Sequence, residues 1–322
     1  MKYQKIDFVE KELSRIVFGT ALEPFLKGEN VDELLDGILE LGVTTIDTAR
    51  AYQGSEEVIG NWLDARKCRD QVTILTKCGH PDEAGNIRVN AACMWEDLKI
   101  SQEKLKTDYF DIYLLHRDDE NRPVGELVEA FNEMHEQGLI GAFGGSNWTT
   151  ARIAEANVYA KQHSLIPYTV TSPNFGLAEQ VNDVWSGGCT TISGPDHEAD
   201  RQWCREQHMP VFAYSSLARG LFAGKIKSSE RARMAEILDE VTKFGYDCDA
   251  NFKRLARVEE LSAKKGYSIS QIAMAWIFCQ PMLDMFAICG STNVLRMKEN
   301  LAALEIELTE NEVQYLDLRT DQ

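Results

Sequence analysis

The sequence has no long apolar run, no paired-cysteine motif and relatively few basic residues, and each shortage excludes a class of protein. No segment of the 322 residues approaches the ~20 consecutive apolar residues that a membrane-spanning helix requires. The eight cysteines are scattered, without a C-x-x-C pair or a Cys/His cluster, so neither a disulfide framework nor a zinc site is expected. With 34 basic and 51 acidic residues, the net charge of −17 disfavours nucleic acid and anionic membranes as partners.

Cysteine usage and the first residues both favour a reducing compartment. The opening sequence MKYQKIDFVEKELSR is too charged for a signal peptide, and the unpaired thiols suit the cytoplasm, which is the expected location. The negative net charge still allows an anionic cofactor to bind. Such a cofactor would need a local cluster of donors that works against the overall field.

Composition and length are compatible with one globular domain. Hydrophobic residues make up 44% of the chain and charged residues 26%, which is ordinary for a globular protein. The length fits two average domains or a single α/β barrel with insertions. Because no low-complexity tract and no Pro-, Gly- or Ser-rich linker interrupts the sequence, we predict one domain over residues 1–322.

Strand and helix patterns alternate almost from end to end. After a short hairpin at 3–8 and 11–14, strands are expected at 15–19, 44–47, 72–77, 109–115, 140–146, 167–172, 210–215 and 285–289. Helices are expected at 31–41, 55–66, 90–105, 124–137 and 149–163, with closing helices at 293–301 and 309–319. Eight parallel strands predict an α/β fold, a (β/α)8 TIM barrel with an N-terminal β-hairpin and extra C-terminal helices.

An open, doubly wound sheet is the alternative architecture. It is disfavoured because no G-x-G-x-x-G opens the first strand–helix unit, as a Rossmann nucleotide site would require. Two long loops, 173–197 and 216–250, interrupt the alternation. Loops of that length in compact folds are often lids or binding elements.

Four polar residues at the ends of successive predicted strands point to proton chemistry. Tyr52 is a possible general acid, but a phenol with a pKa near 10 needs a nearby cation to stabilise the phenolate. Lys77 supplies that cation, Asp47 can pair with it, and His116 can orient a carbonyl or relay a proton. Each residue also has a structural interpretation, since tyrosine packs, lysine is solvated, aspartate caps helices and histidine occurs in cores.

The complete ordered set of motifs resembles that of the aldo-keto reductase family over essentially the whole chain. The motifs are Gly19-Thr20, Asp47-Thr48-Ala49 with Tyr52, Lys77, Leu114-Leu115-His116, Ser146-Asn147, Tyr214-Ser215, Gly290-Ser291 and Glu299-Asn300. The resemblance implies that Tyr52 donates the proton, Lys77 and Asp47 tune it, and His116 positions the substrate carbonyl. It further implies hydride transfer from a reduced nicotinamide, without a metal.

The resemblance also implies a set of cofactor-binding residues. They are Gly19, Thr20, Ser146, Asn147, Ser172, Tyr214, Ser215, Leu217, Arg219, Gly220, Lys225, Gly290, Ser291, Thr292, Arg296, Glu299 and Asn300. In this set Tyr214 stacks on the nicotinamide, the 215–220 segment with Lys225 cradles the pyrophosphate, and Ser172 stands where the family usually has glutamine. Gly290 replaces a frequent lysine, which leaves Arg296 as the main cation for a 2′-phosphate, so NADP(H) is favoured over NAD(H).

The expected substrate is a small carbonyl compound or alcohol. Phe25, Trp148 and Trp185 are predicted to form an apolar wall, and Arg50 and Arg117 to meet hydroxyls or a charged group. The predicted reaction reduces an aldehyde or ketone, possibly sugar-like, or runs in reverse. A nicotinamide-binding redox sensor with little turnover is the alternative, and a metal-dependent hydrolase is disfavoured because the first strand lacks H-x-H. The pattern specifies no oligomeric state.

Overall fold

The computed structural model describes residues 1–185 and 187–321. Its strands are β1 (Tyr3–Gln4), β2 (Leu13–Ser14), β3 (Ile16–Gly19), β4 (Thr45–Asp47), β5 (Thr73–Cys78), β6 (Phe110–Leu115), β7 (Ile140–Ser146), β8 (Val170–Ser172), β9 (Val211–Ala213) and β10 (Met285–Cys289). The strands β3 to β10 close a barrel in the order β10-β3-β4-β5-β6-β7-β8-β9, and β1 pairs with β2 in an antiparallel hairpin. The predicted (β/α)8 barrel with its hairpin is therefore confirmed, and the doubly wound alternative is excluded.

The predicted helices are present with small shifts at their ends. They are α2 (Asp32–Glu40), α3 (Ser55–Arg66), α4 (Ala91–Leu105), α5 (Gly125–Glu136), α6 (Thr150–Gln162), α12 (Val294–Leu301) and α13 (Glu310–Leu316). Six further helices were not predicted from the sequence: α1 (Glu23–Leu26), α7 (Glu198–Glu206), α8 (Met234–Ile237), α9 (Glu240–Tyr246), α10 (Asp249–Lys265) and α11 (Ile269–Phe278). Short 3₁₀ turns are η1 (Arg69–Gln71), η2 (Pro195–His197), η3 (Ala218–Gly220), η4 (Ser228–Arg233) and η5 (Ala302–Glu305).

The expected long loop at 216–250 is thus wrong in part, because η3, η4, α8 and α9 occupy much of it. These elements are short, and short helices carry too few apolar repeats for a periodicity to stand out. Among the described residues of the predicted loop at 173–197, the one helical turn is η2. Among the described residues, no helix combines the length and apolarity needed to cross a membrane.

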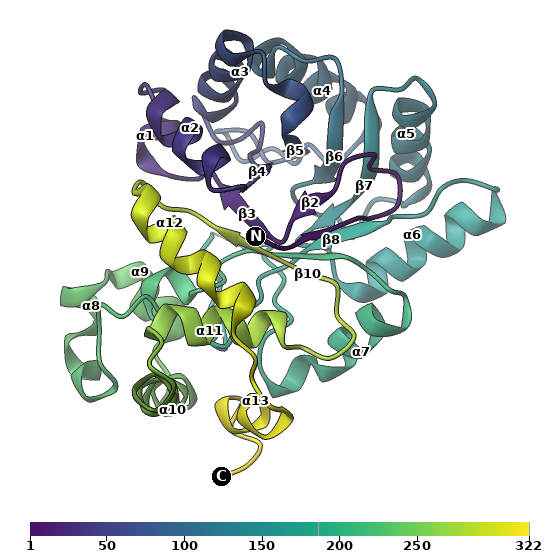
Figure 1. The fold of residues 1–322 in the computed structure, drawn as a ribbon. Helices are drawn as coiled ribbons and strands as arrows, with labels where there is room; N and C mark the ends of the chain where they lie inside the picture. Colours follow the sequence, from purple (N-terminus) through teal and green to yellow (C-terminus); the bar gives the residue numbers. More distant parts are fainter. Residues whose placement is uncertain (186, 322) are drawn as a thin grey trace. The chain divides into compact units, whose positions relative to one another are not determined.

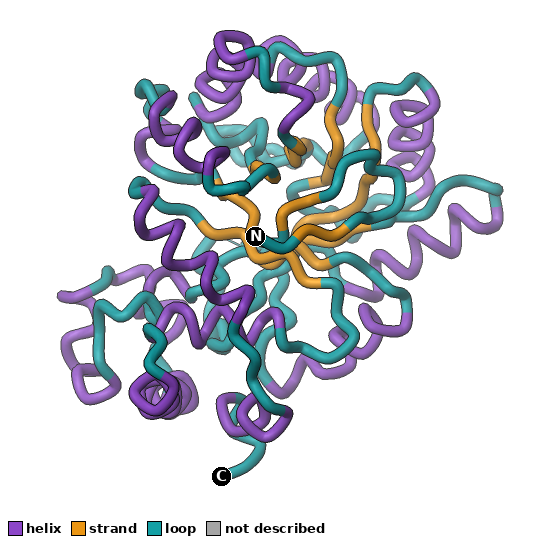
Figure 2. Tube along the Cα trace, viewed as in Figure 1, coloured by secondary structure: helices purple, strands orange, loops and turns teal. Residues whose placement is uncertain are grey.

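The chain divides into two compact units. The first comprises residues 1–172 with 290–294, and the second comprises 173–289 with the described residues from 295 onward. In the first unit, α3, α4 and α5 lie outside strands β4 to β7 (Figure 1). Its strands and helices alternate along the chain, joined by loops (Figure 2). The single domain over 1–322 stays a prediction.

The core of the first unit explains why its strands read as nearly continuous apolar runs. Every residue of β5 and of β6 is buried, because one face points into the barrel and the other meets the helices. Phe131 of α5 stacks on Phe143 of β7 with ring centroids 5.0 Å apart, and the buried Tyr168 meets both rings edge-on. Apolar packing of this kind fixes the strands whose ends carry the polar residues.

Strand register brings the predicted polar residues to one edge. In the parallel pairs, Asp47 of β4 lies opposite Leu75, and Lys77 of β5 lies opposite Leu114, two residues before His116. Because the carboxyl ends of parallel strands meet at the same end of a barrel, Asp47, Lys77 and His116 share one rim. This shared rim was predicted from the order of the strand ends in the sequence.

A buried carboxyl braces the strand that carries Lys77. Glu56 of α3 is 1% exposed, and its two oxygens accept hydrogen bonds from Thr76 Oγ1 at 2.6 Å and Ser101 Oγ at 3.0 Å. Burial raises the pKa of Glu56, although the two hydroxyl donors act in the opposite direction. The folded state therefore resists ionisation of Glu56 more than the unfolded chain does.

We expect the stability of Glu56→Gln, measured relative to wild type, to be greater at neutral pH than at acid pH. Since the folded pKa is raised, the stability that Glu56 contributes is present below its unfolded pKa and is lost as pH rises through the folded pKa. Glutamine cannot ionise, so the variant's urea midpoint minus that of wild type increases from pH 4 to pH 8. Glu57→Gln, an exposed neighbour on α3, is the control. A midpoint difference that stays the same from pH 4 to pH 8 would contradict the raised pKa of Glu56.

Candidate active site

The four predicted catalytic residues all lie in the first unit. Asp47 is the last residue of β4, Lys77 lies in β5, and His116 follows β6 directly. Tyr52 occupies the turn between β4 and α3, where its backbone N–H donates to Ala49 O at 2.9 Å. Asp47, Lys77 and His116 are buried, whereas Tyr52 is partly exposed.

Asp47 and Lys77 form a buried ion pair. The Lys77 ammonium donates to Asp47 Oδ1 at 2.5 Å and to Thr48 O at 2.8 Å, and its Nζ lies 5.1 Å from the centre of the Tyr52 ring. Burial alone would lower the pKa of Lys77, but the Asp47 carboxylate and the Tyr52 phenol outweigh it and the pKa is raised. Lys77 therefore keeps its charge beside the phenol.

Tyr52 and His116 are both neutral near pH 7. Burial raises the pKa of Tyr52, and the opposing effect of Lys77 does not cancel it, so the phenol retains a proton to donate. The His116 ring meets the Tyr52 ring edge-on with centroids 5.6 Å apart. Burial lowers the pKa of His116 well below its usual value, and the positive charges of Lys77 and Arg117 lower it further. An uncharged imidazole can hydrogen-bond a carbonyl oxygen without a net charge.

A chain of hydroxyls holds the end of β4. Thr20 Oγ1 donates to Asp47 O at 2.8 Å, Ser55 Oγ donates to Thr20 Oγ1 at 2.8 Å, and Thr48 Oγ1 lies 3.0 Å from Ser55 Oγ. The Thr20 hydroxyl, predicted to bind cofactor, is thus engaged with the backbone of Asp47. This network fixes the strand end from which the ion pair projects.

His80 is a site residue that the sequence analysis missed. Its ring lies 4.9 Å from that of His116, and its Nδ1 is 2.9 Å from Pro81 O. Because a carbonyl oxygen only accepts, Nδ1 carries the proton and donates a hydrogen bond to Pro81 O. Burial lowers the pKa of His80, so a second neutral imidazole adjoins the first. The signal was present in the sequence, since His80 follows Lys77 by three residues beyond a strand end.

Several predicted cofactor residues of the first unit form a connected group at the ends of β7 and β8. Ser146 Oγ donates to Ser172 O at 3.0 Å, and Asn147 Nδ2 donates to Ser146 Oγ at 3.3 Å and to His116 O at 3.1 Å. The backbone of Asn147 is left-handed, with φ of 62°. Since its proton is already donated, the Ser146 hydroxyl can serve a further ligand only as an acceptor.

The closing segment of the first unit approaches β3. A Cβ added at Gly290 would lie 2.8 Å from Gly19 O, which explains why a glycine occupies this position. Ser291 Oγ lies 3.1 Å from Asn293 O and accepts from Asn293 N at 3.0 Å, so its side chain stabilises the turn before α12. Thr292 is exposed.

In the second unit, the predicted pyrophosphate loop has an unusual backbone. Ser215, Ala218, Arg219 and Gly220 all have positive φ values, from 49° to 106°. The backbone N–H groups of Ala218 and Gly220 donate to Ser215 O at 2.7 Å and to Leu217 O at 3.0 Å, so these residues form a tight turn. Tyr214 and Leu217 are partly exposed in this segment, and Lys225 beyond it is exposed.

Arg219 is held beside two other segments of the second unit. Its guanidinium lies 4.9 Å from the Trp185 ring and its Nη2 is 3.7 Å from Asp239 Oδ2. Its Nε is buried and, among the described residues, lacks a partner. Trp185, predicted as a pocket residue, is 41% exposed, and its role at a pocket stays a prediction.

The remaining predicted cofactor residues lie along α12. Arg296 and Glu299 are exposed, and the backbone carbonyl of Glu299 accepts from Gln271 Nε2 at 3.0 Å. Asn300 is buried and its Nδ2 lies 3.2 Å from Cys289 Sγ. Because that amide group is directed at Cys289, any contact of Asn300 with adenine stays a prediction.

The predicted substrate residues of the first unit differ in exposure. Phe25 has no exposed surface and packs on Phe18 with ring centroids 5.7 Å apart, and Trp148 is 1% exposed. Arg50 and Arg117 are partly exposed. In this structure the two arginines present surface to solvent and the two aromatic side chains do not, and their roles at a pocket stay predictions. Within residues 1–185 and 187–321, no three His, Cys, Asp or Glu side chains gather as a metal site.

The barrel carries a phenol, a buried cation and an imidazole at its strand ends, which is the rim where (β/α)8 enzymes have their active sites. The aldo/keto reductase family profile matches residues 15–318, and the chain belongs to this family. It is an oxidoreductase of the carbonyl–alcohol class. The resemblance inferred from the ordered motifs is confirmed.

Curated relatives match most of the chain at low identity. A probable aryl-alcohol dehydrogenase, AAD4, of Saccharomyces cerevisiae is 26% identical over 302 residues, covering 90% of this chain and 87% of the relative. Norsolorinic acid reductase B of Dothistroma septosporum is 27% identical, covering 90% of this chain and 71% of the relative. Aldo-keto reductase YhdN of Bacillus subtilis is 27% identical, covering 88% and 83%.

Proposed function

We propose that this protein is an NADP(H)-dependent reductase of aldehydes or ketones that also catalyses the reverse alcohol oxidation. Tyr52 is the general acid for reduction and the general base for oxidation. The observation that carries this proposal is the buried Asp47–Lys77 ion pair, whose ammonium lies 5.1 Å from the centre of the Tyr52 ring. We also place the protein in the cytoplasm, with a small carbonyl compound or alcohol as its substrate.

Residues of the second unit fit the phosphates of a nicotinamide dinucleotide. Arg219 Nε is a buried donor that lacks an acceptor among the described residues, and it lies in the left-handed 215–220 segment. A phosphate oxygen is the acceptor such a donor accommodates best, because the hydrogen bond is charge-assisted. We therefore assign Ser215, Leu217, Arg219 and Gly220 to the pyrophosphate, with Lys225 nearby.

The other cofactor contacts are proposed from the family resemblance. Tyr214 stacks on the nicotinamide ring, and Ser146 accepts from its carboxamide while Asn147 and Ser172 complete that contact. Gly19, Thr20 and Gly290 shape the site, Ser291, Thr292 and Arg296 hold the adenosine phosphate, and Glu299 and Asn300 meet adenine. When bound, the reduced nicotinamide supplies a hydride to the carbonyl carbon.

The chain's own residues provide the proton and the orientation. The neutral His116 imidazole donates a hydrogen bond to the carbonyl oxygen, and the Tyr52 phenol gives that oxygen its proton. The Lys77 ammonium stabilises the phenolate that remains, and Asp47 holds the ammonium in place. In alcohol oxidation the same phenolate accepts the proton.

A carbonyl panel tests the proposal. Sugars, glycosides, short aliphatic aldehydes, aromatic aldehydes and ketosteroids are assayed with the purified protein by loss of NADPH absorbance at 340 nm. We expect turnover of at least one class, with NADPH preferred to NADH. A protein that binds NADPH tightly and reduces nothing in the panel contradicts catalysis and instead supports a redox-sensing role.

We expect Arg296→Ala to weaken NADPH binding about ten- to a hundredfold and NADH binding little. A charge-assisted contact with the 2′-phosphate is worth roughly 1.5–3 kcal/mol, and only NADPH carries that group. Cofactor affinity is measured by quenching of intrinsic fluorescence. Lys298→Ala removes another exposed cation from α12 and serves as the control. Equal weakening of both cofactors would remove the basis for NADPH preference.

A further inference from the structure

Two arginines at the rim of the first unit are weakly neutralised, since Arg117 has no ion pair among the described residues and Arg50 has one long contact with Asp97. Arg50 follows β4 and Arg117 follows β6, the two strands on either side of β5 with Lys77. Both side chains are partly exposed. Exposed cations at the mouth of a catalytic site matter more in a chain with a net charge of −17, because the overall field repels anions.

Arg117 has no ion pair in the described part of the chain because the nearby acids are committed elsewhere. The next residue, Asp118, pairs with Arg152, whose Nε donates to Asp118 Oδ2 at 3.0 Å. Asp119 Oδ1 accepts from the backbone and the side chain of Asn121. The guanidinium of Arg117 is left with one hydrogen bond, from Nη1 to His116 O at 2.9 Å.

The backbone that carries Arg117 is fixed from several sides. Trp148 Nε1 donates to Arg117 O at 3.1 Å, and Asn147 Nδ2 donates to His116 O at 3.1 Å. Arg152 further braces the loop by donating to Arg122 O at 2.9 Å. The cation is therefore held beside His116, where it opposes the burial-driven rise in the pKa of Tyr52 and adds to the burial that lowers the pKa of His80. An ordered guanidinium loses little conformational entropy when it binds a ligand.

Arg50 is also poorly neutralised. Its Nε lies 3.8 Å from Asp97 Oδ1, but that oxygen accepts from Arg88 Nη2 at 2.7 Å and the other oxygen accepts from Gly79 N at 2.9 Å. The Nε of Arg50 is buried without a hydrogen-bond partner among the described residues. The backbone N–H of Arg50 bonds Lys77 O at 3.0 Å, which ties the residue to the catalytic strand.

Other groups near Arg117 do not remove its charge. The buried Asp47–Lys77 pair is neutral as a unit, and His80 and His116 are uncharged near pH 7. Arg88 pairs with both Glu96 and Asp97, and Asp97 also lies near Arg50, so these two carboxylates balance the two arginines. Among the described residues, the positive charge at the rim that has no carboxylate partner is that of Arg117, and it is open to a bound anion.

We propose that Arg117, assisted by Arg50, binds a carboxylate on the carbonyl substrate, so that the enzyme selects anionic aldehydes or ketones. This inference rests on the proposed carbonyl reductase function and names its substrate class. A guanidinium suits a planar carboxylate because two parallel N–H groups can engage both oxygens. The substrate's charge then orients its carbonyl toward His116 and Tyr52.

Two aldehydes of similar size and different charge state provide the test, and comparing their ratio between variants cancels their different intrinsic reactivities. The pair is 4-carboxybenzaldehyde and its methyl ester, which differ in charge at one position. We expect wild type to prefer the carboxylate in kcat/KM. In Arg117→Gln, the ratio of the two kcat/KM values should fall about ten- to a hundredfold, as expected for the loss of a charge-assisted contact. Arg117→Lys keeps the charge without the planar fork and should fall in between.

Arg122→Gln is the matched control, since it removes one positive charge from the same loop and its partner is Glu126. Its selectivity ratio should equal that of wild type. Binding of benzoate and benzamide, measured by calorimetry, gives a readout independent of turnover, and Arg117→Gln should weaken only benzoate. Circular dichroism melting verifies that each variant is folded.

The outcomes separate the possible roles of Arg117. If Arg117→Gln lowers kcat/KM for both aldehydes equally and shifts the pH profile, then Arg117 only tunes Tyr52 and the carboxylate proposal is wrong. If Arg117→Gln leaves the ratio of the two kcat/KM values unchanged, the proposal is wrong while carbonyl reduction stands. If wild type reduces neither these aldehydes nor any other panel member, the proposed function itself fails.

Discussion

Tyr52→Phe is expected to fold and bind cofactor normally but to lose at least a hundredfold in kcat. The substitution keeps the ring that meets His116 and removes only the hydroxyl. Phenylalanine has no proton for the developing alkoxide, and a positioned general acid is worth about 10²–10⁴-fold. Lys77 is ill suited to replace it, because its pKa is raised and its ammonium is committed to Asp47. Steady-state kinetics and fluorescence titration of NADPH measure the two properties separately.

Tyr267→Phe is the control. Tyr267 is 40% exposed, and its substitution removes a tyrosine hydroxyl that has no proposed role in catalysis. It should retain wild-type kcat and cofactor affinity. A Tyr52→Phe protein that reduces carbonyls at the wild-type rate would overturn the assignment of Tyr52 as the acid. Loss of cofactor binding together with turnover would instead indicate that the hydroxyl supports the site's structure.

The barrel was predictable because its strands are buried on both faces. Continuous apolar segments such as β5 and β6 stand out from the amphipathic helices between them, and eight of them suffice to close a barrel. No element was predicted between 251 and 284, although this segment holds most of α10 and all of α11. Its signals were local, since Gly266 ends α10 with φ of 75° and Ser268 forms a capping box with Gln271.

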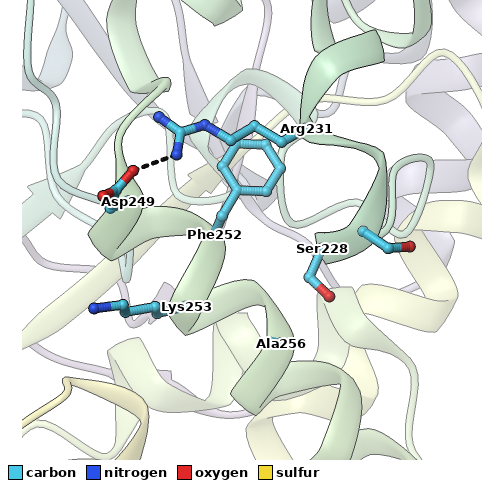
Figure 3. A pocket seen from close by; sticks show the side chains of 7 residues that line it. Ser228, Arg231, Asp249, Phe252, Lys253 and Ala256 are labelled. Carbon is cyan, nitrogen blue, oxygen red and sulfur yellow. Dashed lines mark hydrogen bonds and ion pairs between the residues drawn. The ribbon is translucent and has the colours of Figure 1, made fainter.

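A shallow surface cavity of about 420 Å³ in the second unit shows a different limit of sequence reasoning. It is lined by Ser228 and Ser229 at the start of η4, by Arg231, and by residues of α10 (Figure 3). Arg231 pairs with Asp249 and lies over the Phe252 ring, 5.4 Å from its centre. These residues share no motif in the sequence, and only tertiary packing brings them together.

The proposed catalytic residues were predictable for a geometric reason. Parallel strands end at one rim, and strands that follow one another in the sequence lie side by side in the barrel. Polar residues at the ends of consecutive strands are therefore expected to be neighbours. The charge balance of Arg117 was not predictable, because it depends on which acids are occupied. Asp118 is adjacent in sequence, yet it pairs with Arg152, 34 residues away. Partner choice among charged side chains is settled by tertiary geometry.

Lys77→Met is expected to lose both catalysis and stability. Methionine fills much of the lysine's volume but leaves the Asp47 carboxylate, 3% exposed, without its cation. Removing one partner of a buried ion pair typically costs about 3–5 kcal/mol. The phenolate of Tyr52 also loses its nearest cation, so kcat should fall by about 10²-fold or more. Urea unfolding and steady-state kinetics on the same preparation measure both effects.

The loss of stability should depend on pH, and a second substitution should relieve it. Burial raises the pKa of Asp47, and without Lys77 nothing opposes that effect, so stability is retained at low pH and lost as pH rises through the folded pKa. Adding Asp47→Asn removes the buried charge and should restore the urea midpoint at pH 8 without restoring kcat. Lys99→Met, on the exposed side of α4, should change neither property. Recovery of turnover in the double variant would show that Lys77 acts by neutralising the Asp47 carboxylate and not by stabilising the Tyr52 phenolate.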